Sequence, residues 1–319
     1  MTFAAHFETF HGLPVLTFAE PSERALPAAG EVAWRLDCSW ETPFADLWQS
    51  FVDRVPSTEV RALVIGPWWH DEYSDLRPAL ELILADAERF PALRALFLAD
   101  VTGEECEVSW LRLTDVTPVL ERFPRLEELG VRGGSSHGLG EEPLSLRPVR
   151  HDALRVLRFE SGGLPGEVVR AVGACELPAL EHLELWLGVS HYGGDATVAD
   201  LAPILAQGRF PALRHLGVQD SELQDEIAAA LASAPVVAQL ESLSLSMGTL
   251  TDTGAEALLR GRPLTRLRRL DLHHHFLSES MAERIRTAFG SAGAEVDLSD
   301  RRTPHRRRDE ERRYVAVSE

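Results

Sequence analysis

One apolar line of sequence recurs along this chain and constrains its fold more than any other feature. The segments FPALRALFL, FPRLEELGV and FPALRHLGV, which begin at Phe90, Phe123 and Phe210, carry it most clearly. Each contains three apolar residues in the pattern LxxLxL. Degenerate copies lie at Trp34 and Val296, and the middle residues of the eight full copies are Leu63, Leu96, Leu129, Leu157, Leu183, Leu216, Leu243 and Leu270. These stand 26 to 33 residues apart, and such a period predicts an array of similar supersecondary units.

The segments between the copies predict helices. SELQDEIAAALA (221–232) and LTDTGAEALLRG (250–261) show apolar spacings of three and four, with a Ser or Thr near the start. A strand followed by a returning helix makes successive strands parallel. One unit cannot bury its own leucines, each of which contributes about 1.5–3 kcal/mol when buried, so the units stabilise one another only by stacking. We therefore predict an α/β solenoid with about ten parallel strands.

The repeats resemble a known repeat class. In the stretch 250–278, Leu250, Gly254, Ala255 and Leu258 match the helical half of ribonuclease-inhibitor-like leucine-rich repeats. The whole chain also resembles an uncharacterised family of bacterial cytosolic leucine-rich-repeat proteins, through FHGLPV near its start and RYVAVSE at its end. The resemblance implies a horseshoe, with the parallel sheet on the concave side and the helices on the convex side. It implies an interaction surface but no particular activity.

Three segments divide the chain. Residues 1–29 hold FAAHFETF and LPVLTF on either side of a His-Gly pair, which predicts a hairpin that caps the first exposed edge of the sheet. Residues 30–300 form the solenoid. Residues 301–319 are an arginine-rich tail, in which YVAVS alternates as a strand does and could dock on a second exposed edge.

The charge of the chain excludes several functional classes. Its net charge is −18, and all 32 basic residues are arginines. Chemistry that needs lysine, such as a Walker A phosphate loop or a Schiff base, is therefore excluded. An acidic body repels phosphate backbones, so we expect no nucleic-acid partner. Because no apolar stretch reaches the roughly 18 residues of a membrane span, and because the cysteines are few and no basic leader is present, we expect a cytoplasmic protein without membrane contact or cofactor.

Two surfaces of the predicted solenoid suit a protein partner. Alternate residues of each strand face away from the buried leucines and line the concave side. Several loops that follow strands are expanded and share one rim, where aromatic residues on a rigid scaffold can anchor a partner. The partner-binding residues predicted on the concave side are Phe97, Arg132, Arg158, His182, Glu184 and His215. Those predicted on the rim or just beneath it are Trp68, Trp69, Tyr73, Trp110, Trp186 and Tyr192.

The rim tryptophans have an alternative interpretation. They could fill gaps beneath irregular loops, as large aromatic side chains often do. We favour Trp68 and Trp69 as exposed anchors, because two adjacent tryptophans are difficult to bury together.

Two motifs suggest chemistry of their own. GSSHG (134–138) matches the GxSxG nucleophile elbow around Ser136, but no helical pattern follows it, as that motif requires. The run HHH could place His273 and His275 on one face of a strand with Asp271. Zinc needs three or four converging ligands, so a hydrophilic strand end accounts better for the run, and we expect no metal site there.

A third group combines histidines from neighbouring strands. His182 and His215 occupy equivalent positions of two repeats, and Glu184 lies nearby. Such a group could perform acid–base catalysis, yet polar residues on a concave sheet more often contact a partner. We therefore predict a non-enzymatic protein–protein interaction module, a scaffold or an adaptor. The alternative is a hydrolase or a metal-dependent enzyme that uses His182 and His215 or the histidines at 273–275.

Overall fold

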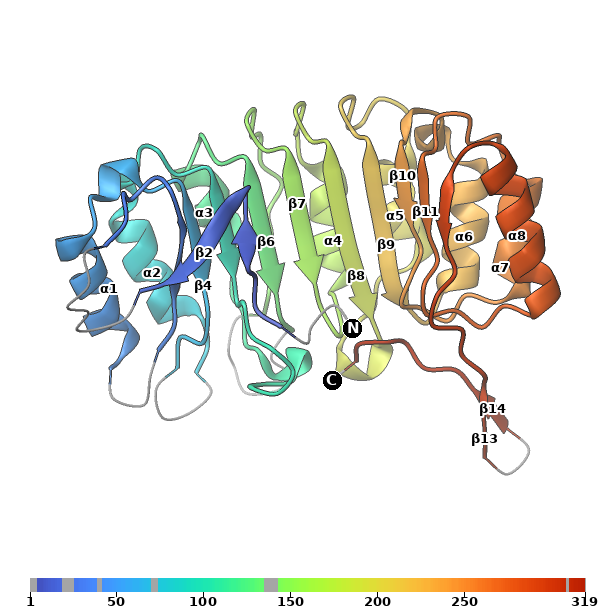
Figure 1. Cartoon of the computed structure of the whole chain (residues 1–319), viewed down its shortest axis with the longest axis horizontal. Coiled ribbons are helices and arrows are strands. Elements are labelled where there is room, and N and C mark those ends of the chain that lie inside the picture. Colours follow the sequence, from blue (N-terminus) through green and yellow to red (C-terminus); the bar gives the residue numbers. More distant parts are fainter. Residues whose placement is uncertain are drawn as a thin grey trace.

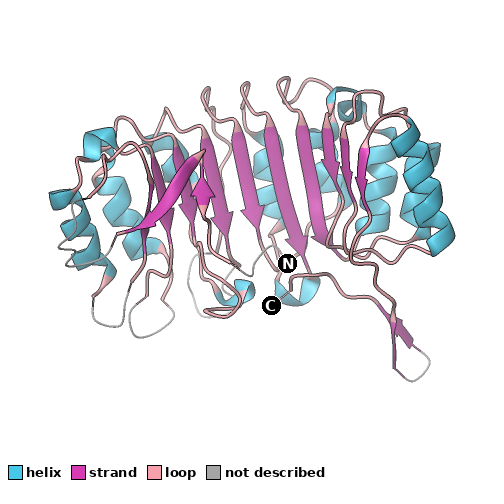
Figure 2. Cartoon of the chain, viewed as in Figure 1, coloured by secondary structure: helices cyan, strands magenta, loops and turns pink. Residues whose placement is uncertain are grey.

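Two layers make up the chain, and Figure 1 shows a continuous sheet in front of a row of helices. The computed structural model describes residues 5–18, 26–38, 42–69, 74–134, 143–307 and 310–318. Over these ranges the chain contains a twelve-stranded, mostly parallel sheet and eight α-helices. Figure 2 shows the helices behind the sheet and at its two ends. The predicted α/β class with a large parallel sheet is confirmed.

The strands follow one another across the sheet in chain order. β1 and β2 pair antiparallel, and every later pair from β2 to β12 is parallel. Middle residues of successive motifs lie opposite each other, as Leu63 does to Leu96. The motif therefore sets the register of the sheet. The strands are β1 (Thr9–Phe10), β2 (Leu13–Thr17), β3 (Ala33–Leu36), β4 (Ala62–Ile65), β5 (Ala95–Leu98), β6 (Glu128–Arg132), β7 (Val156–Glu160), β8 (His182–Gly188), β9 (His215–Ser221), β10 (Ser242–Ser244), β11 (Arg269–Asp271) and β12 (Glu295–Asp297).

Helices return the chain behind the sheet and complete the core. The middle leucines of all eight full motifs are completely buried, and one continuous apolar cluster extends from Phe18 to Ile285. All repeats therefore share one core. The helices are α1 (Phe44–Arg54), α2 (Arg77–Ala85), α3 (Thr117–Arg122), α4 (Gly166–Ala174), α5 (Val198–Leu205), α6 (Gln224–Ser233), α7 (Asp252–Arg260) and α8 (Glu279–Ser291). Among these helices, none has the length and apolar character that crossing a membrane requires.

An N-terminal hairpin begins the sheet. β1 and β2 are joined by His11 and Gly12, which both have positive φ, a conformation that glycine adopts without strain. β2 pairs in parallel with β3 and so forms the first strand of the parallel sheet. The hairpin also supplies Phe7 and Phe10 to a second, smaller apolar cluster on the side of the sheet opposite the helices.

The C-terminal tail does not add a strand to the sheet. β13 (His305–Arg307) and β14 (Glu310–Arg312) form a separate two-stranded antiparallel sheet. The residues that follow, Tyr314–Ser318, run back beneath the ends of the parallel strands toward the middle of the molecule (Figure 1). We call them the C-terminal strap. The alternation of YVAVS is real, since Val315 is buried between exposed neighbours, but it docks on strand ends and not on a sheet edge.

Backbone hydrogen bonds hold the C-terminal strap in place. Its contacts are His274 Nε2 with the Tyr314 carbonyl oxygen at 3.0 Å, the Ala316 N–H donating to the Met247 carbonyl oxygen at 2.7 Å, and the Val317 N–H donating to Asp220 Oδ1 at 2.9 Å. Asp220 is completely buried under the strap. Burial raises the pKa of its carboxyl group well above the usual value, against the opposing effect of the strap's N–H groups.

Candidate functional site

The side of the sheet that the helices leave uncovered is here called the open face. Alternate residues of each strand point toward it, and the parallel register arranges them in rows across the sheet. One row begins at the ion-paired Arg35, is apolar at Val64 and Phe97, and is mostly polar from Arg158 onward. It consists of Arg35, Val64, Phe97, Gly130, Arg158, Glu184, Gly217, Ser244, Asp271 and Asp297.

Phe97 is covered by the chain's own N-terminal hairpin. Its ring is completely buried and makes edge-to-face contacts with Phe7 and Phe10, at centroid distances of 4.6 and 6.1 Å. A Cβ at Gly130 would come within 2.3 Å of the Phe97 ring, so glycine at this position makes room for it. The prediction that Phe97 contacts a partner is wrong, because the apolar patch around it is already occupied.

Arg132 is also internal. Only 2% of its surface is exposed. Its Nε donates to Glu160 Oε2 at 2.7 Å, one Nη donates to the Val101 carbonyl oxygen at 3.0 Å, and its guanidinium lies 5.3 Å from the centre of the Phe97 ring. Burial raises the pKa of Glu160, and the charge of Arg132 opposes this effect. The predicted partner contact is therefore a buried ion pair that joins β6 to β7.

Two of the predicted rim tryptophans are buried. Trp68 is 4% exposed, and its Nε1 donates to the Ser74 carbonyl oxygen at 2.9 Å. Trp69 packs edge-to-face against Trp68 at a centroid distance of 5.0 Å and is half-buried. Contrary to our expectation, these two adjacent tryptophans are therefore both largely removed from solvent. Trp186 is completely buried, and its Nε1 donates to Glu184 Oε1 at 3.1 Å. The predictions of Trp68 and Trp186 as accessible contacts are wrong.

Trp110 and Tyr192 remain at the surface to different degrees. Trp110 ends a short 3₁₀ helix between β5 and β6 and is 57% exposed. Tyr192 is half-buried and packs edge-to-face with His191 at 4.9 Å. Tyr73, the remaining predicted rim residue, and Ser136, from the GxSxG match that lacks a following helix, lie outside the described residues.

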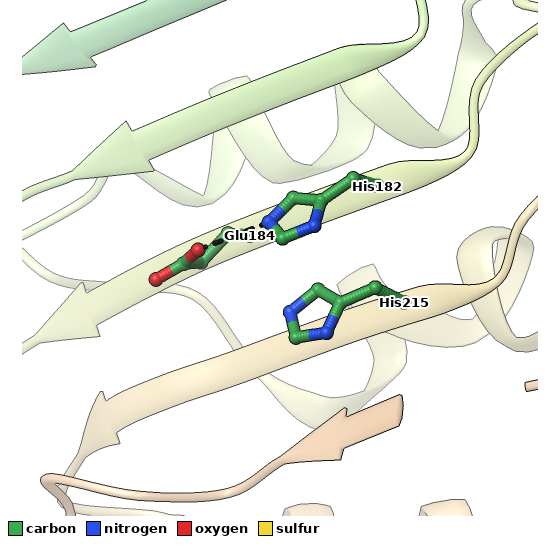
Figure 3. A group of neighbouring side chains, drawn as sticks. All are labelled: His182, Glu184 and His215. Atoms are coloured by element: carbon green, nitrogen blue, oxygen red, sulfur yellow. Dashed lines mark hydrogen bonds and ion pairs between the residues drawn. The ribbon is translucent and has the colours of Figure 1, made fainter. Parts of the chain in front are cut away.

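The polar second half of the open face centres on four predicted residues that do come together. β7 supplies Arg158, β8 supplies His182 and Glu184, and β9 supplies His215. Figure 3 shows the two imidazole rings side by side, with the carboxylate at their end. The rings stack at a centroid distance of 3.9 Å and an angle of 12°. One donor atom from each of His182, Glu184 and His215 lies within 4.8 Å of the others.

Glu184 is the most connected member of the group. Its Oε1 accepts hydrogen bonds from Trp186 Nε1 and from Gln219 Nε2, the latter at 2.9 Å. Its Oε2 lies 3.2 Å from His182 Nε2 and 3.8 Å from Arg158 Nε. Burial acts to raise the pKa of Glu184, but the hydrogen bond with His182 and the charge of Arg158 outweigh it and hold the pKa at about 2. Glu184 is therefore ionised at neutral pH.

His215 is held in its neutral form. Burial, followed by the neighbouring His182, lowers its pKa to about 4. Its Nδ1 lies 3.0 Å from Ser242 Oγ. Its Nε2 is buried and has no hydrogen-bond partner among the described residues. At neutral pH the ring therefore offers an unused nitrogen close to a carboxylate.

The HHH run divides between two environments. His274 and His275 are buried, and their Nε2 atoms bond to the carbonyl oxygens of Tyr314 and Leu298. His273 stays half-exposed, and its Nδ1 lies 2.8 Å from Asp271 Oδ1. The alternative that placed His273 and His275 together is not realised, and the expected hydrophilic strand end holds for His273 but not for the buried His274 and His275. Asp297 joins Asp271 and His273 instead, with donor atoms within 4.8 Å.

The residues that support the polar cluster were not among the partner contacts predicted from the sequence. Ser242 orients His215, and Gln219 reaches Glu184 across the position of Gly217. A Cβ at Gly217 would come within 2.5 Å of Gln219 Nε2. A glycine inside a strand often marks such a close approach. Gly217 was therefore the sequence feature that could have indicated it.

Comparison with known proteins supports the fold and gives no activity. No protein-family model matches the chain, and no curated protein matches it. Seventeen chains of solved structures match. Among them is a crystal structure of a Bacteroides fragilis protein from a structural-genomics programme, with a TM-score of 0.73 and 27% identity. The similarity covers 83% of this chain and 75% of that one.

Proposed function

We propose that this chain is a leucine-rich-repeat protein of the ribonuclease-inhibitor-like class. In this proposal it acts as a non-enzymatic scaffold or adaptor that binds a protein partner through the open face of β7–β12. Three observations support the class. The strands pair in parallel at successive motif leucines, helices return the chain on one side, and a single core runs through all repeats. The matching Bacteroides fragilis structure has a similar architecture.

The accessible polar half of the open face carries the functional proposal. The chain's own hairpin covers the apolar half, whereas eight polar side chains on β7–β11 and just after β11 are half-buried or exposed. A rigid surface of this kind, together with the exposed Trp110 in the loop between β5 and β6, suits a protein partner, because side chains fixed by a scaffold lose little entropy on binding. The residues are Arg158, His182, Glu184, His215, Ser242, Arg269, Asp271 and His273.

A hydrolase acting at the same cluster is the second candidate, because two stacked histidines and an ionised carboxylate lie together there. Enzymes generally enclose their substrates in a cleft. Two hollows of the described surface, one lined by Thr251, Phe276 and Arg313 and the other by Phe90 and Phe123, do not include the cluster.

A charge reversal on the open face tests the proposal. Arg269 is exposed on β11, and Arg286 is exposed on α8 in the helical layer. The full-length chain is used as bait in extracts of its own cells, and co-purifying proteins are quantified for the wild type and for the variants Arg269→Glu, Trp110→Ala and Arg286→Glu. We expect one partner to be reduced at least about tenfold by Arg269→Glu or Trp110→Ala and to be retained by the Arg286→Glu control, as for residues inside and outside an interface.

Two results would overturn the proposal. In the first, every co-purifying protein is retained by both Arg269→Glu and Trp110→Ala. In the second, the Arg286→Glu control loses the same protein, which would indicate a general effect of charge. Thermal unfolding of each variant confirms that the fold is intact.

A further inference from the structure

We propose that His182, Glu184 and His215 form a binding site for a divalent transition metal, with zinc the best match. Two imidazoles and one carboxylate are a ligand set that zinc adopts when it keeps a fourth position open. The three donor atoms lie within 4.8 Å of one another. The proposal goes beyond partner binding and stands whether or not the open face binds a protein.

The unused nitrogen of His215 is the first observation that points to a ligand. His215 Nε2 is buried without a hydrogen-bond partner in the described part of the chain, and a buried polar atom in that state is unfavourable. The opposite nitrogen, Nδ1, lies 3.0 Å from Ser242 Oγ. Donation of the Nδ1 proton to that hydroxyl leaves the lone pair on Nε2, which is the arrangement of histidines that bind metals.

The hydrogen bonds of Glu184 are the second observation. Trp186 and Gln219 both donate to Oε1, which fixes the carboxylate from behind. Oε2 is left facing His182 Nε2 at 3.2 Å. A zinc ion with bonds of about 2.0–2.2 Å in tetrahedral geometry holds its donors about 3.4 Å apart. His182 Nε2 and Glu184 Oε2 already have about this spacing. On zinc binding, only the His215 ring would therefore have to move toward the ion, and its stacking on the His182 ring would be lost.

Arg158 is the cation that now faces the carboxylate. Its Nε lies 3.8 Å from Glu184 Oε2, and its Nη1 lies 3.6 Å from Glu128 Oε1. Its own Nε is buried without a hydrogen bond to any described residue. Arg158 therefore competes with a metal for the charge of Glu184 without being firmly held there. Its removal should strengthen metal binding, whereas removal of a ligand should weaken it.

The neighbouring group on β11 and β12 lacks these features. Asp271, His273 and Asp297 also bring donor atoms within 4.8 Å. However, His273 Nδ1 is bonded to Asp271 Oδ1 at 2.8 Å, and Asp297 Oδ1 accepts the Ser299 N–H at 2.9 Å. His182 and Glu184 are joined in a similar way, but among the described residues only the first group also has a buried nitrogen without a hydrogen-bond partner, His215 Nε2. The experiment therefore uses a His273→Ala background, so that only the first group is measured.

Zinc titration of the full-length, untagged, chelator-treated protein tests the site. Isothermal calorimetry with Zn²⁺ should show one equivalent bound in the His273→Ala background. His215→Ala and Glu184→Gln should each weaken binding by about 10-fold or more, and His191→Ala, which removes an exposed histidine from a nearby loop, should leave it unchanged. Arg158→Gln should tighten it severalfold. Co²⁺ in place of Zn²⁺ should give visible absorption of tetrahedral intensity, which is lost in Glu184→Gln.

The outcomes separate a site from incidental binding. The proposal is overturned if Zn²⁺ shows no saturable binding, or if His215→Ala and Glu184→Gln bind as the background protein does. It is also overturned if Arg158→Gln weakens binding, because this variant keeps all three ligands. A gain in affinity cannot result from misfolding, so the Arg158→Gln measurement decides the matter even if a ligand variant is unstable.

Discussion

The two halves of the open face are built from the same repeat, yet one is covered and the other is bare. At one set of equivalent positions the first half presents Ala33, Ala62 and Ala95, and the second presents His182 and His215. Phe7 and Phe10 of the N-terminal hairpin pack on the first set. The second set remains half-exposed.

This difference shows how to interpret outward-facing residues in a repeat array. The motif leucines fix the core side of each strand, so the opposite side varies without disturbing the stack. An apolar stretch on that side must be covered to avoid a large exposed patch, and here the chain provides the cover itself. A polar stretch needs no cover and stays available for a ligand.

Removal of the central ring of the covered half should have the largest effect. Phe97→Ala empties a completely buried site under the hairpin and should lower the free energy of unfolding by about 3–5 kcal/mol. Urea denaturation followed by circular dichroism measures it. The matched change His215→Ala, on the bare half, should cost less than about 1 kcal/mol at pH 7.5, as for other partly exposed positions. Equal losses at the two positions would contradict the contrast between the halves.

The bare half should give the protein its sensitivity to mild acid. The pKa of His215 is about 4 in the folded chain, below the ordinary value of 6.5. Between these values the folded state binds fewer protons than the unfolded state. The contribution of neutral His215 to the free energy of unfolding is therefore fully present above pH 6.5 and is lost as the pH falls toward 4. The full loss is at most about 3.4 kcal/mol. His215→Gln should flatten the profile in urea titrations at pH 7.5, 6 and 5 with a chelator present, whereas Phe97→Ala should leave its slope unchanged. A His215→Gln profile parallel to the wild type would refute this assignment.

The smallest effect is expected at the exposed tryptophan. Trp110 is 57% exposed and Trp68 is 4% exposed. Trp110→Ala should change the free energy of unfolding by less than about 0.5 kcal/mol, and Trp68→Ala should lower it by about 3–5 kcal/mol. Thermal and urea unfolding of the two variants measure the difference. A loss of more than about 1 kcal/mol in Trp110→Ala would place its ring in the structural core.

The sheet could be predicted from the sequence because the position of the motif in each repeat determines which residues of neighbouring strands pair. Leucines that recur at one position of each repeat must stack, which places Leu183 opposite Leu216. The meeting of His182 with His215 follows from this pairing, since each precedes its motif leucine by one residue.

The aromatic residues were not predictable in the same way, because their burial depends on distant segments. Phe97 is covered by Phe7 and Phe10, which belong to a different part of the chain. Trp186 occupies an open-face position beside Gln219, yet it is completely buried. Repeat periodicity gives the direction of a side chain and says nothing of what packs over it.

The C-terminal strap changes how an array of this kind can come apart. Arrays whose units touch only their neighbours can lose units one at a time from an end. Here the last residues reach from His274, after β11, to Gly162, after β7, where an added Cβ would come 2.6 Å from the Ser318 carbonyl oxygen. We therefore expect the terminal repeats to stay in place until this tie is released. Through residues 314–318, the C-terminal half should then open as one cooperative block.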